Sequence, residues 1–184
     1  KMALVSDGRF IGSVSGGCVE NAVYEAGVES LKTKRPQLLH FGVADETAWE
    51  VGLACGGSIE VFVKPLDKGF LEELCSVINN DEPAVAVAVI RGPDDILGRE
   101  LLLHDNGMVA GTFGSEWDEV VIKLAHEALS NGISQRVELN EDVEIFLEAI
   151  LPSHTLIIFG GVHIAVSLTS MAKALGYRTI VIDP

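Results

Sequence analysis

Residues 2–15 read MALVSDGRFIGSVS, and residues 101–114 read LLLHDNGMVAGTFG, at a constant offset of 99. Each stretch holds two short apolar runs around a turn, which predicts a β-hairpin, and a helical pattern follows each hairpin. Later in the chain, SIEVFV at residues 58–63 matches DVEIFL at residues 142–147 at an offset of 84. A pattern that recurs in this way predicts an internally duplicated domain.

Two cysteine elements distinguish the first copy from the second. Each sets one cysteine beside two glycines: Gly16, Gly17 and Cys18 in the first element, and Cys55, Gly56 and Gly57 in the second. The second copy has Ser115, Glu116 and Trp117 in place of the first element, and it lacks about 15 residues around the second. If the two elements served packing alone, both copies should need them. Their presence in one copy therefore indicates a binding site laid over a structural repeat.

The apolar patterns also predict the order of the elements. Strands are expected at residues 2–5, 10–14, 37–41, 58–65, 83–90 and 142–147, and helices at residues 18–31, 69–80 and 117–129. Cys18 would then lie at a helix N-terminus, where the macrodipole and free amides lower the pKa of a thiol and attract anions. Cys75 falls between Leu71, Leu74 and Ile78, and we interpret it as a core residue.

The pattern changes after Pro152. A continuous apolar strand at residues 155–159, a glycine turn, a helix to about residue 175 and a strand at residues 178–183 predict the start of a Rossmann unit. The glycine fingerprint is imperfect, because Val162 stands where the second glycine would let a pyrophosphate approach. Two interpretations therefore remain open for this part of the chain: a nucleotide-binding domain, or a doubly wound domain with a purely structural role.

Composition excludes several classes of function. The net charge is −14 without a basic cluster, which argues against nucleic-acid binding. No apolar run is long enough for a transmembrane helix, and no signal peptide is recognisable, so membrane association is not expected. Three cysteines without zinc-type spacing favour a reducing cytoplasm over a disulfide framework or a structural zinc site. Both ends of the sequence fall beside predicted strands, so we expect it to be part of a longer chain.

Several motifs together resemble the XdhC/CoxI family of xanthine dehydrogenase accessory (maturation) factors. They are GSVSGGCVE at residues 12–20, WEVGLACGG at residues 49–57, FGGVHIA at residues 159–165 and MAKALGYRTIVIDP at residues 171–184. The resemblance implies an α/β protein with two domains. Residues 1–152 would form the XdhC/CoxI-type domain, with repeats at 1–66 and 84–152, and residues 153–184 the first βαβ unit of a Rossmann-like domain. The family pattern also places a strand before Lys1 and continues past Pro184.

The same resemblance implies a function as a chaperone of the molybdenum cofactor (molybdopterin). Such a protein would bind the cofactor as cargo, hold it during sulfuration and deliver it to a xanthine dehydrogenase-type apoenzyme. A cysteine desulfurase-type protein would supply sulfur, and the chaperone would act as a homodimer in the cytoplasm. An accessory role of this kind is more consistent with a non-enzyme, and no catalytic residue is assigned.

The cofactor site is expected at the two cysteine elements. Cys18 and Cys55 would place soft thiolates near molybdenum. Gly16, Gly17, Gly56 and Gly57 would allow close approach of the backbone, with amides for a phosphate or an oxo-anion. Glu20 would orient a pterin amino group, or would simply be a solvated residue of the first helical turn, and it aligns with Glu119 of the second copy. A weaker set of cofactor-binding candidates lies at the Rossmann-like turn: Gly160, Gly161, His163 and Asp183.

Two other functions remain open from the sequence. One is an NAD(P)-dependent oxidoreductase that uses the Rossmann-like part, with Val162 counting against it. The other is a non-catalytic scaffold whose duplicated domain mediates dimerisation, which is compatible with the chaperone role.

Overall fold

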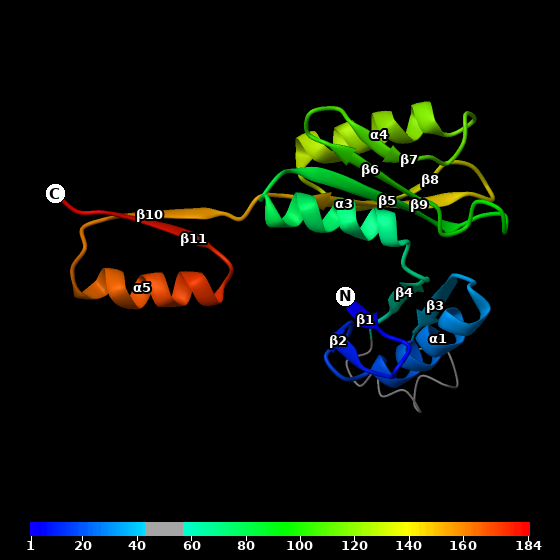
Figure 1. The fold of residues 1–184 in the computed structure, drawn as a ribbon, viewed down its shortest axis with the longest axis horizontal. Coiled ribbons are helices and arrows are strands. Elements are labelled where there is room, and N and C mark those ends of the chain that lie inside the picture. Colours follow the sequence, from blue (N-terminus) through cyan, green and yellow to red (C-terminus); the bar gives the residue numbers. More distant parts are fainter. Residues whose placement is uncertain (43–56) are drawn as a thin grey trace.

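The computed structural model describes residues 1–42 and 57–184 (Figure 1). An N-terminal unit comprises β1 (Met2–Leu4), β2 (Phe10–Gly12), α1 (Glu20–Thr33), β3 (Gln37–Phe41) and β4 (Ile59–Val63). A central unit comprises α3 (Lys68–Asn79), β5 (Ala84–Arg91), β6 (Glu100–His104), β7 (Val109–Gly111), α4 (Asp118–Asn131), β8 (Gln135–Glu138) and β9 (Glu144–Ile150). A C-terminal unit comprises β10 (Thr155–Phe159), α5 (His163–Ala174) and β11 (Arg178–Ile182). The predicted α/β fold class is confirmed.

The central unit is built on an antiparallel sheet in the order β7-β6-β5-β9-β8. Strand β5 lies in the middle and pairs with β6 on one side and with β9 on the other. Because side chains alternate across a strand, Val85, Val87 and Val89 join the core beneath α4, whereas Ala84 and Ala86 pack against α3. The two helices therefore cover opposite faces of the sheet, as Figure 1 shows.

The core of the central unit explains why this part of the chain folds as it does. Leu101 and Leu103 from β6, Ile145 and Leu147 from β9, and Val121 from α4 are each 0% exposed. Burial of one such side chain stabilises the folded state by about 2 kcal/mol relative to an exposed one. The periods of two on the strands and of three to four on the helix place these residues at one interface.

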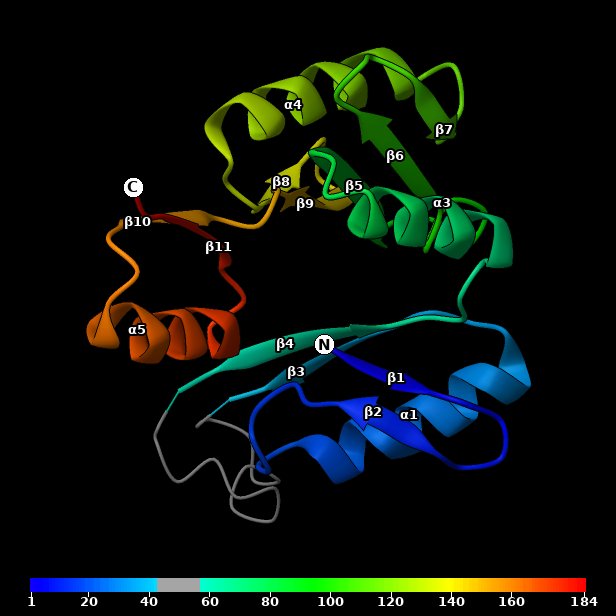
Figure 2. The same cartoon turned by 60° about the vertical axis from the view of Figure 1, so that its left-hand side comes forward.

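The N-terminal unit repeats this arrangement with one strand fewer among the described residues. Strands β1 and β2 form one antiparallel pair, and β3 and β4 form another. Helix α1 packs against β1, β3 and β4, and it runs alongside both pairs (Figure 2). At Gly27 the helix comes so close to β1 that an added Cβ would lie 2.8 Å from a methyl carbon of Leu4.

The strand registers confirm the duplication that the sequence predicts. Strand β1 pairs with β2 as β6 pairs with β7, at an offset of 99 in both strands. The β3–β4 pair recurs as β8–β9, at an offset of 98 in the first strand and 84 in the second. The drop from 98 to 84 means that 14 more residues connect β3 to β4 than connect β8 to β9. The insertion expected from the sequence therefore lies in this connection, which contains residues 43–56.

The C-terminal unit is a βαβ element with a parallel strand pair. Strand β10 pairs with β11 from Thr155 opposite Arg178 to Phe159 opposite Ile182. Helix α5 packs against β11 through an apolar face that includes the buried Ala165. The predicted strand–helix–strand order is confirmed, and its continuation into a complete Rossmann-like domain stays a prediction.

One residue prediction for the core is wrong. Cys75 is exposed rather than buried. Helix α3 carries two adjacent apolar stripes, and the stripe of Phe70, Leu74 and Val77 is the one that contacts the sheet. Cys75 and Ile78 belong to the other stripe, and Ile78 is 57% exposed.

Within residues 1–42 and 57–184, no helix combines the length and the apolar character needed to cross a membrane.

Candidate functional site

The first cysteine element lies in a loop between β2 and α1. The loop begins at Gly12, whose φ is +89° and where an added Cβ would lie 2.2 Å from the carbonyl oxygen of Lys1. A side chain at this position would therefore break the hairpin. The chain then turns through Gly16 and Gly17, with φ values of +80° and +125°. The loop ends at Val19, which is fully buried and precedes the first residue of the helix.

Glu20 organises this loop from the first turn of α1. Its Oε1 accepts hydrogen bonds from the Ser13 hydroxyl (2.6 Å) and from the N–H groups of Ser15 (2.9 Å), Gly16 (2.9 Å) and Val14 (3.1 Å). Its Oε2 accepts from the Ser15 hydroxyl (2.6 Å) and from the Gly17 N–H (2.8 Å). One carboxylate thus ties together five consecutive residues. The hydroxyls of Ser13 and Ser15, followed by the backbone amides, hold the pKa of Glu20 far below its ordinary value.

These contacts give Glu20 a different role from the expected one. Both carboxylate oxygens already face donors within the loop, so Glu20 is neither a simply solvated residue nor a free acceptor for a pterin amino group. It acts as the centre of the loop. The sequence does contain a sign of this role, because Ser13 and Ser15 alternate just before a glutamate at the helix start, and hydroxyl residues favour such local bonds.

Cys18 lies in the loop and not in the helix. Helix α1 begins at Glu20, two residues later than the predicted start. The N–H groups of Cys18 and Val19 both donate to the hydroxyl of Ser15, at 3.0 Å each. The side chain of Cys18 is half-buried, and its thiol forms no disulfide within the described part of the chain. The loop therefore holds the backbone of Cys18 in place, with its side chain near the surface.

The expected phosphate-binding amides are not free. The N–H groups of Gly16 and Gly17 donate to Glu20, and the N–H of Cys18 donates to Ser15. The prediction that these amides offer a vacant anion site is therefore wrong for this loop, because an internal carboxylate occupies it. The glycines still leave open space, since an added Cβ at Gly16 or Gly17 would meet no atom within 4 Å.

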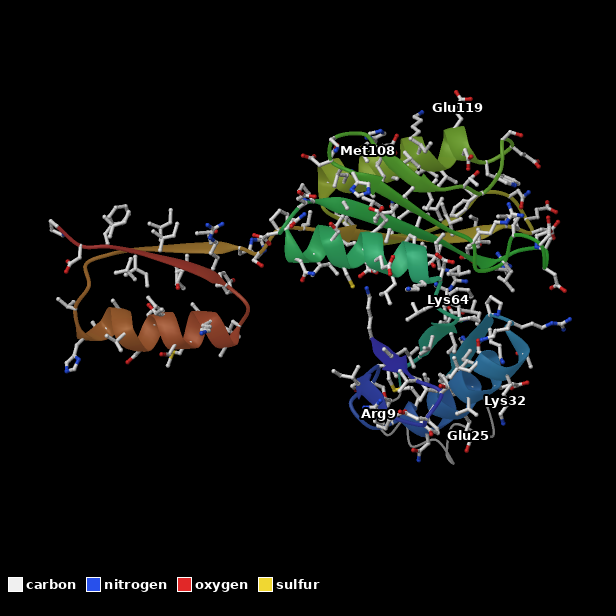
Figure 3. The ribbon with its side chains drawn as sticks, viewed as in Figure 1. Arg9, Glu25, Lys32, Lys64, Met108 and Glu119 are labelled. Atoms are coloured by element: carbon white, nitrogen blue, oxygen red, sulfur yellow. The ribbon has the colours of Figure 1, made fainter. Side chains whose placement is uncertain are left out.

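The second copy contains a simpler form of the same loop. There Asp118 accepts hydrogen bonds from the Thr112 hydroxyl (2.6 Å) and the Phe113 N–H (2.7 Å). Asp118 is thus the counterpart of Glu20, and the alignment of Glu20 with Glu119 is wrong. The reason is that the second loop is one residue shorter between β7 and its helix. Glu119 itself points away from the sheet at the surface of α4 (Figure 3).

The second cysteine element falls partly outside the described residues. Cys55 and Gly56 lie in residues 43–56, so the expectation that the thiols of Cys18 and Cys55 both lie near one metal falls outside the described residues as well. Gly57 is described and exposed, and an added Cβ there would meet no atom within 4 Å. Phe41 and Ile59, which pair at the two ends of the insertion, show where it leaves the fold.

The duplicated fold relates this exit point to the Cys18 loop. By strand register, Phe41 and Ile59 correspond to Leu139 and Val143. Those two residues pack in one cluster with Phe113 and Trp117, which lie in the short loop before α4. The corresponding loop of the first copy carries Cys18. The insertion therefore starts and ends at the end of the N-terminal unit on which the Cys18 loop lies.

The Rossmann-like turn brings together three of its four candidate residues. Gly160 has a φ of +102° and donates its N–H to the carbonyl of Ile182 at 2.8 Å. The carboxylate of Asp183 lies against Gly161, where an added Cβ would be 2.9 Å from Oδ2. His163 is exposed at the start of α5. Figure 1 shows this turn in the C-terminal unit, apart from the Cys18 loop, so the two candidate sets do not form one site.

A network of charges joins the N-terminal and central units, and sequence reasoning missed it. Arg136 on β8 pairs with Glu144 on β9 and with Glu60 on β4. Lys64 pairs with Glu100 at 2.6 Å, and Lys1 pairs with Glu148. Lys64 lies between the two units in Figure 3. Ion pairs between residues so distant in sequence leave no local pattern.

The fold and the loop together define a class of protein: a duplicated α/β domain with a cysteine–glycine loop on its first copy, followed by a parallel βαβ unit. Residues 1–42 match the model of the XdhC and CoxI family. Over 99% of its length, the chain is 25% identical to a protein of Bacillus subtilis named as a probable xanthine dehydrogenase subunit, of which it covers 53%. Over 63 residues, or 34% of its length, it is 36% identical to the uncharacterized protein YqeB of Escherichia coli, of which it covers 12%. The resemblance to the XdhC/CoxI family is thereby confirmed.

A solved structure supports the fold. The crystal structure of a xanthine dehydrogenase from Bacillus halodurans matches 98% of this chain with a TM-score of 0.70, at 21% sequence identity. The chain covers 51% of that protein, so it spans about half the length of the relatives that it matches throughout.

Proposed function

We propose that the chain is part of an accessory factor that binds the molybdenum cofactor as cargo and passes it to a xanthine dehydrogenase-type apoenzyme. The two relatives that it matches over nearly its whole length, one in sequence and one in structure, are named as xanthine dehydrogenase proteins, and its first 42 residues match the XdhC and CoxI family. The protein would protect the cofactor and assist its sulfuration, with sulfur from a cysteine desulfurase-type donor. In this role it acts as a binding protein and not as an enzyme.

The observation that carries the proposal is the placement of the two cysteine elements. Both belong to the first copy, and the insertion with Cys55, Gly56 and Gly57 leaves the fold at the end that carries the Cys18 loop. In the proposed site, Cys18 and Cys55 lie next to the metal of the cargo, for which thiolates are suitable neighbours. Gly16 and Gly17, which precede Cys18 in the loop, present open backbone.

Glu20 takes the part of a positioning residue in this proposal. It accepts hydrogen bonds from the N–H groups of Gly16 and Gly17 and thereby fixes the backbone that leads into Cys18. Since its oxygens are occupied by the loop, we assign no contact between Glu20 and the pterin. The phosphate of the cargo is likewise not assigned to the amides of Gly16 and Gly17.

The test is the cofactor content of protein purified from a host that makes the cofactor. Molybdenum would be measured by elemental mass spectrometry and the pterin by fluorescence after oxidation. We expect the parent protein to carry both. We expect Cys18→Ser and Cys55→Ser each to lower the cofactor content by about tenfold or more, because each variant removes one thiol contact to the cargo. Cys75→Ser is the matched control, because this thiol is exposed on α3. Full cofactor content in both folded variants would contradict the proposal.

Homodimer formation and the two protein partners belong to the same proposal and need a separate test. Light scattering of the purified chain measures its mass, and co-purification with a molybdenum-free xanthine dehydrogenase-type apoenzyme measures delivery. We expect transfer of the pterin to the apoenzyme only from cofactor-loaded protein. Transfer at the same rate from free cofactor would show that delivery does not require this protein.

Nucleotide binding is a second candidate, favoured by one observation. The carboxylate of Asp183 lies over the Gly160–Gly161 turn, at the carboxyl ends of two parallel strands, where dinucleotides bind in doubly wound folds. Val162 stands at the following position, 69% exposed, where its branched side chain hinders a pyrophosphate. Titration with NAD(H) and NADP(H) separates the two functions, and saturable binding that Asp183→Ala abolishes would favour an oxidoreductase.

A further inference from the structure

Two equivalent glutamates, one in each copy of the fold, share one arginine. By the offset of 84, Glu60 on β4 corresponds to Glu144 on β9. Arg136 on β8 donates to both of them. Its Nε and Nη2 donate to the two carboxylate oxygens of Glu144, and its Nη1 donates to Oε2 of Glu60. The planar guanidinium thus uses two nitrogens for the carboxylate of its own copy and the third for the carboxylate of the other copy.

The first copy has no arginine of its own at this place. Arg136 stands diagonally from Glu144 in the β8–β9 pair, where a long side chain can reach its neighbour. The offset of 98 makes Leu38 on β3 its counterpart, diagonal to Glu60 in the β3–β4 pair. A leucine side chain has no hydrogen-bond donor. Glu60 therefore takes from the second copy the donor that Glu144 has within its own.

The arginine is fixed on the side of the second copy. Glu144 is 2% exposed, and Arg91 on β5 pairs with it as well, at 3.2 Å. The hydrogen bond from Arg136 holds the pKa of Glu144 below its ordinary value, against the effect of burial. A buried carboxylate that is charged needs such partners, because an unpaired one is costly. Glu144 therefore holds Arg136 in the orientation in which it meets Glu60.

Glu60 lies where the insertion joins the fold. It follows Ile59, which forms with Phe41 the last strand pair before the insertion. Across the pair, Glu60 stands opposite His40, whose Nδ1 lies 3.5 Å from Oε1 of Glu60. The other ring nitrogen of His40 lies beside Gly42, where an added Cβ would be 3.2 Å from Nε2. Contacts thus run from the arginine of the second copy to both strands at the base of the insertion.

We propose that Arg136 is a positioning residue for the candidate cofactor site, although it belongs to the other copy of the fold. By holding Glu60, it fixes the ends of β3 and β4, and with them the two points from which the insertion with Cys55 extends. The inference rests on the proposed cofactor function and deepens it. It gives a part in the site to the second copy, which carries neither cysteine element.

The test compares two arginines that contact the same glutamate. Arg136→Gln removes the ion pair with Glu60, whereas Arg91→Gln weakens the hold on Glu144 and leaves Glu60 untouched. We expect Arg136→Gln to speed amide hydrogen exchange at the ends of β3 and β4 by about tenfold or more. We also expect it to lose most of the cofactor content, measured as for the cysteine variants, because the site is held less firmly. Arg91→Gln should leave both readouts unchanged.

A rescue variant separates positioning from general stability. Leu38→Arg combined with Arg136→Gln gives Glu60 an arginine within its own copy, at the diagonal place, but returns nothing to Glu144. We expect this combination to restore slow exchange at the two strand ends and most of the cofactor content. A loss that Leu38→Arg does not reverse, or an equal loss in Arg91→Gln, would overturn the positioning role.

Failure of the proposed function would give a different result. A parent protein without molybdenum or pterin would overturn that function, and the positioning role with it. Cofactor in the parent, with just as much in Arg136→Gln while Cys18→Ser is depleted, would overturn the positioning role alone.

Discussion

At the scale of single residues, Glu20 is the clearest determinant of the candidate site. A carboxylate at the start of a helix usually stabilises that helix only modestly, through its interaction with the helix dipole. Here it gathers four backbone amides and two hydroxyls, from Ser13 to Gly17. The order of the Cys18 loop therefore depends on one side chain.

Replacement of Glu20 tests this dependence. Glu20→Gln keeps the shape but turns one oxygen into a donor that faces the N–H of Gly17 or the hydroxyl of Ser15. We expect the amides of Gly16 and Gly17 to exchange about tenfold faster or more, with little change in the core. Glu119→Gln, on the exposed face of α4, is the matched control and should leave exchange unchanged. Unchanged exchange in both variants would show that the loop is ordered without Glu20.

The same carboxylate sets a pH dependence with a definite sign. The loop lowers the pKa of Glu20 below its ordinary value of 4.5. A lowered carboxyl pKa contributes stability that is fully present above the ordinary value and is lost as the pH falls through the lower folded value. Protection of the Gly16 and Gly17 amides, corrected for intrinsic exchange, should therefore persist from pH 7 to pH 4.5 and decline only in stronger acid. Loss of protection already near pH 6 would exclude Glu20 as its origin.

At the scale of elements, the duplication offers a matched pair of positions. Leu103 on β6 is 0% exposed, and its counterpart Leu4 on β1 is half-buried. We expect Leu103→Ala to lower the free energy of unfolding of the central unit by about 3 kcal/mol, because it leaves a cavity in a closed core. Leu4→Ala should cost about 1 kcal/mol, since its surroundings are open to water. Chemical denaturation of the two variants measures the difference, and equal losses would mean that β1 is as fully enclosed as β6.

The elements also show how far the sequence determines this fold. Most strands and helices were predictable to within two residues, because their apolar periods are regular. The side of α3 that faces the sheet was not predictable, since its two apolar stripes are similar and only the contact with Ala84 and Leu102 selects one. The one-residue shift between the two copies at the start of the helix was also hidden. The loss of one residue before Asp118 leaves the patterns on both sides of the loop intact.

The site was partly predictable for the same kind of reason. Repetition of Ser13 as Thr112 and the cysteine–glycine elements predict an ordered loop at this place, and the structure has one. The direction of its amides could not be read from residue types, because Gly16 and Gly17 permit both an inward and an outward arrangement. The carboxylate of Glu20 decides between them.

At the scale of the whole molecule, ion pairs connect the N-terminal and central units. The pair of Lys64 and Glu100 is the most enclosed of those between the two units within the described residues, with side chains 14% and 11% exposed. Burial raises the pKa of Glu100, and the ammonium of Lys64 opposes that rise. The pair therefore combines a cost of desolvation with a compensating attraction.

Removal of one partner should expose that cost. Glu100→Gln leaves Lys64 without its counter-charge, and we expect a loss of about 3 kcal/mol in the free energy of unfolding. The double variant Lys64→Met, Glu100→Leu should recover most of the loss, because it removes both desolvated charges. Thermal and chemical denaturation provide the measurement. A double variant as unstable as the single one would show that the contact depends on something other than charge.

The two long-range lysine–glutamate pairs have one more consequence. Lys1 and Glu100 occupy equivalent places in the two copies, and so do Lys64 and Glu148, by the offsets of 99 and 84. The first copy therefore carries two cations at these places and the second copy two anions. Two first copies facing each other would repel, as would two second copies, whereas the unlike halves attract. At these two places the reversed charges therefore favour contact between unlike copies over contact between like ones.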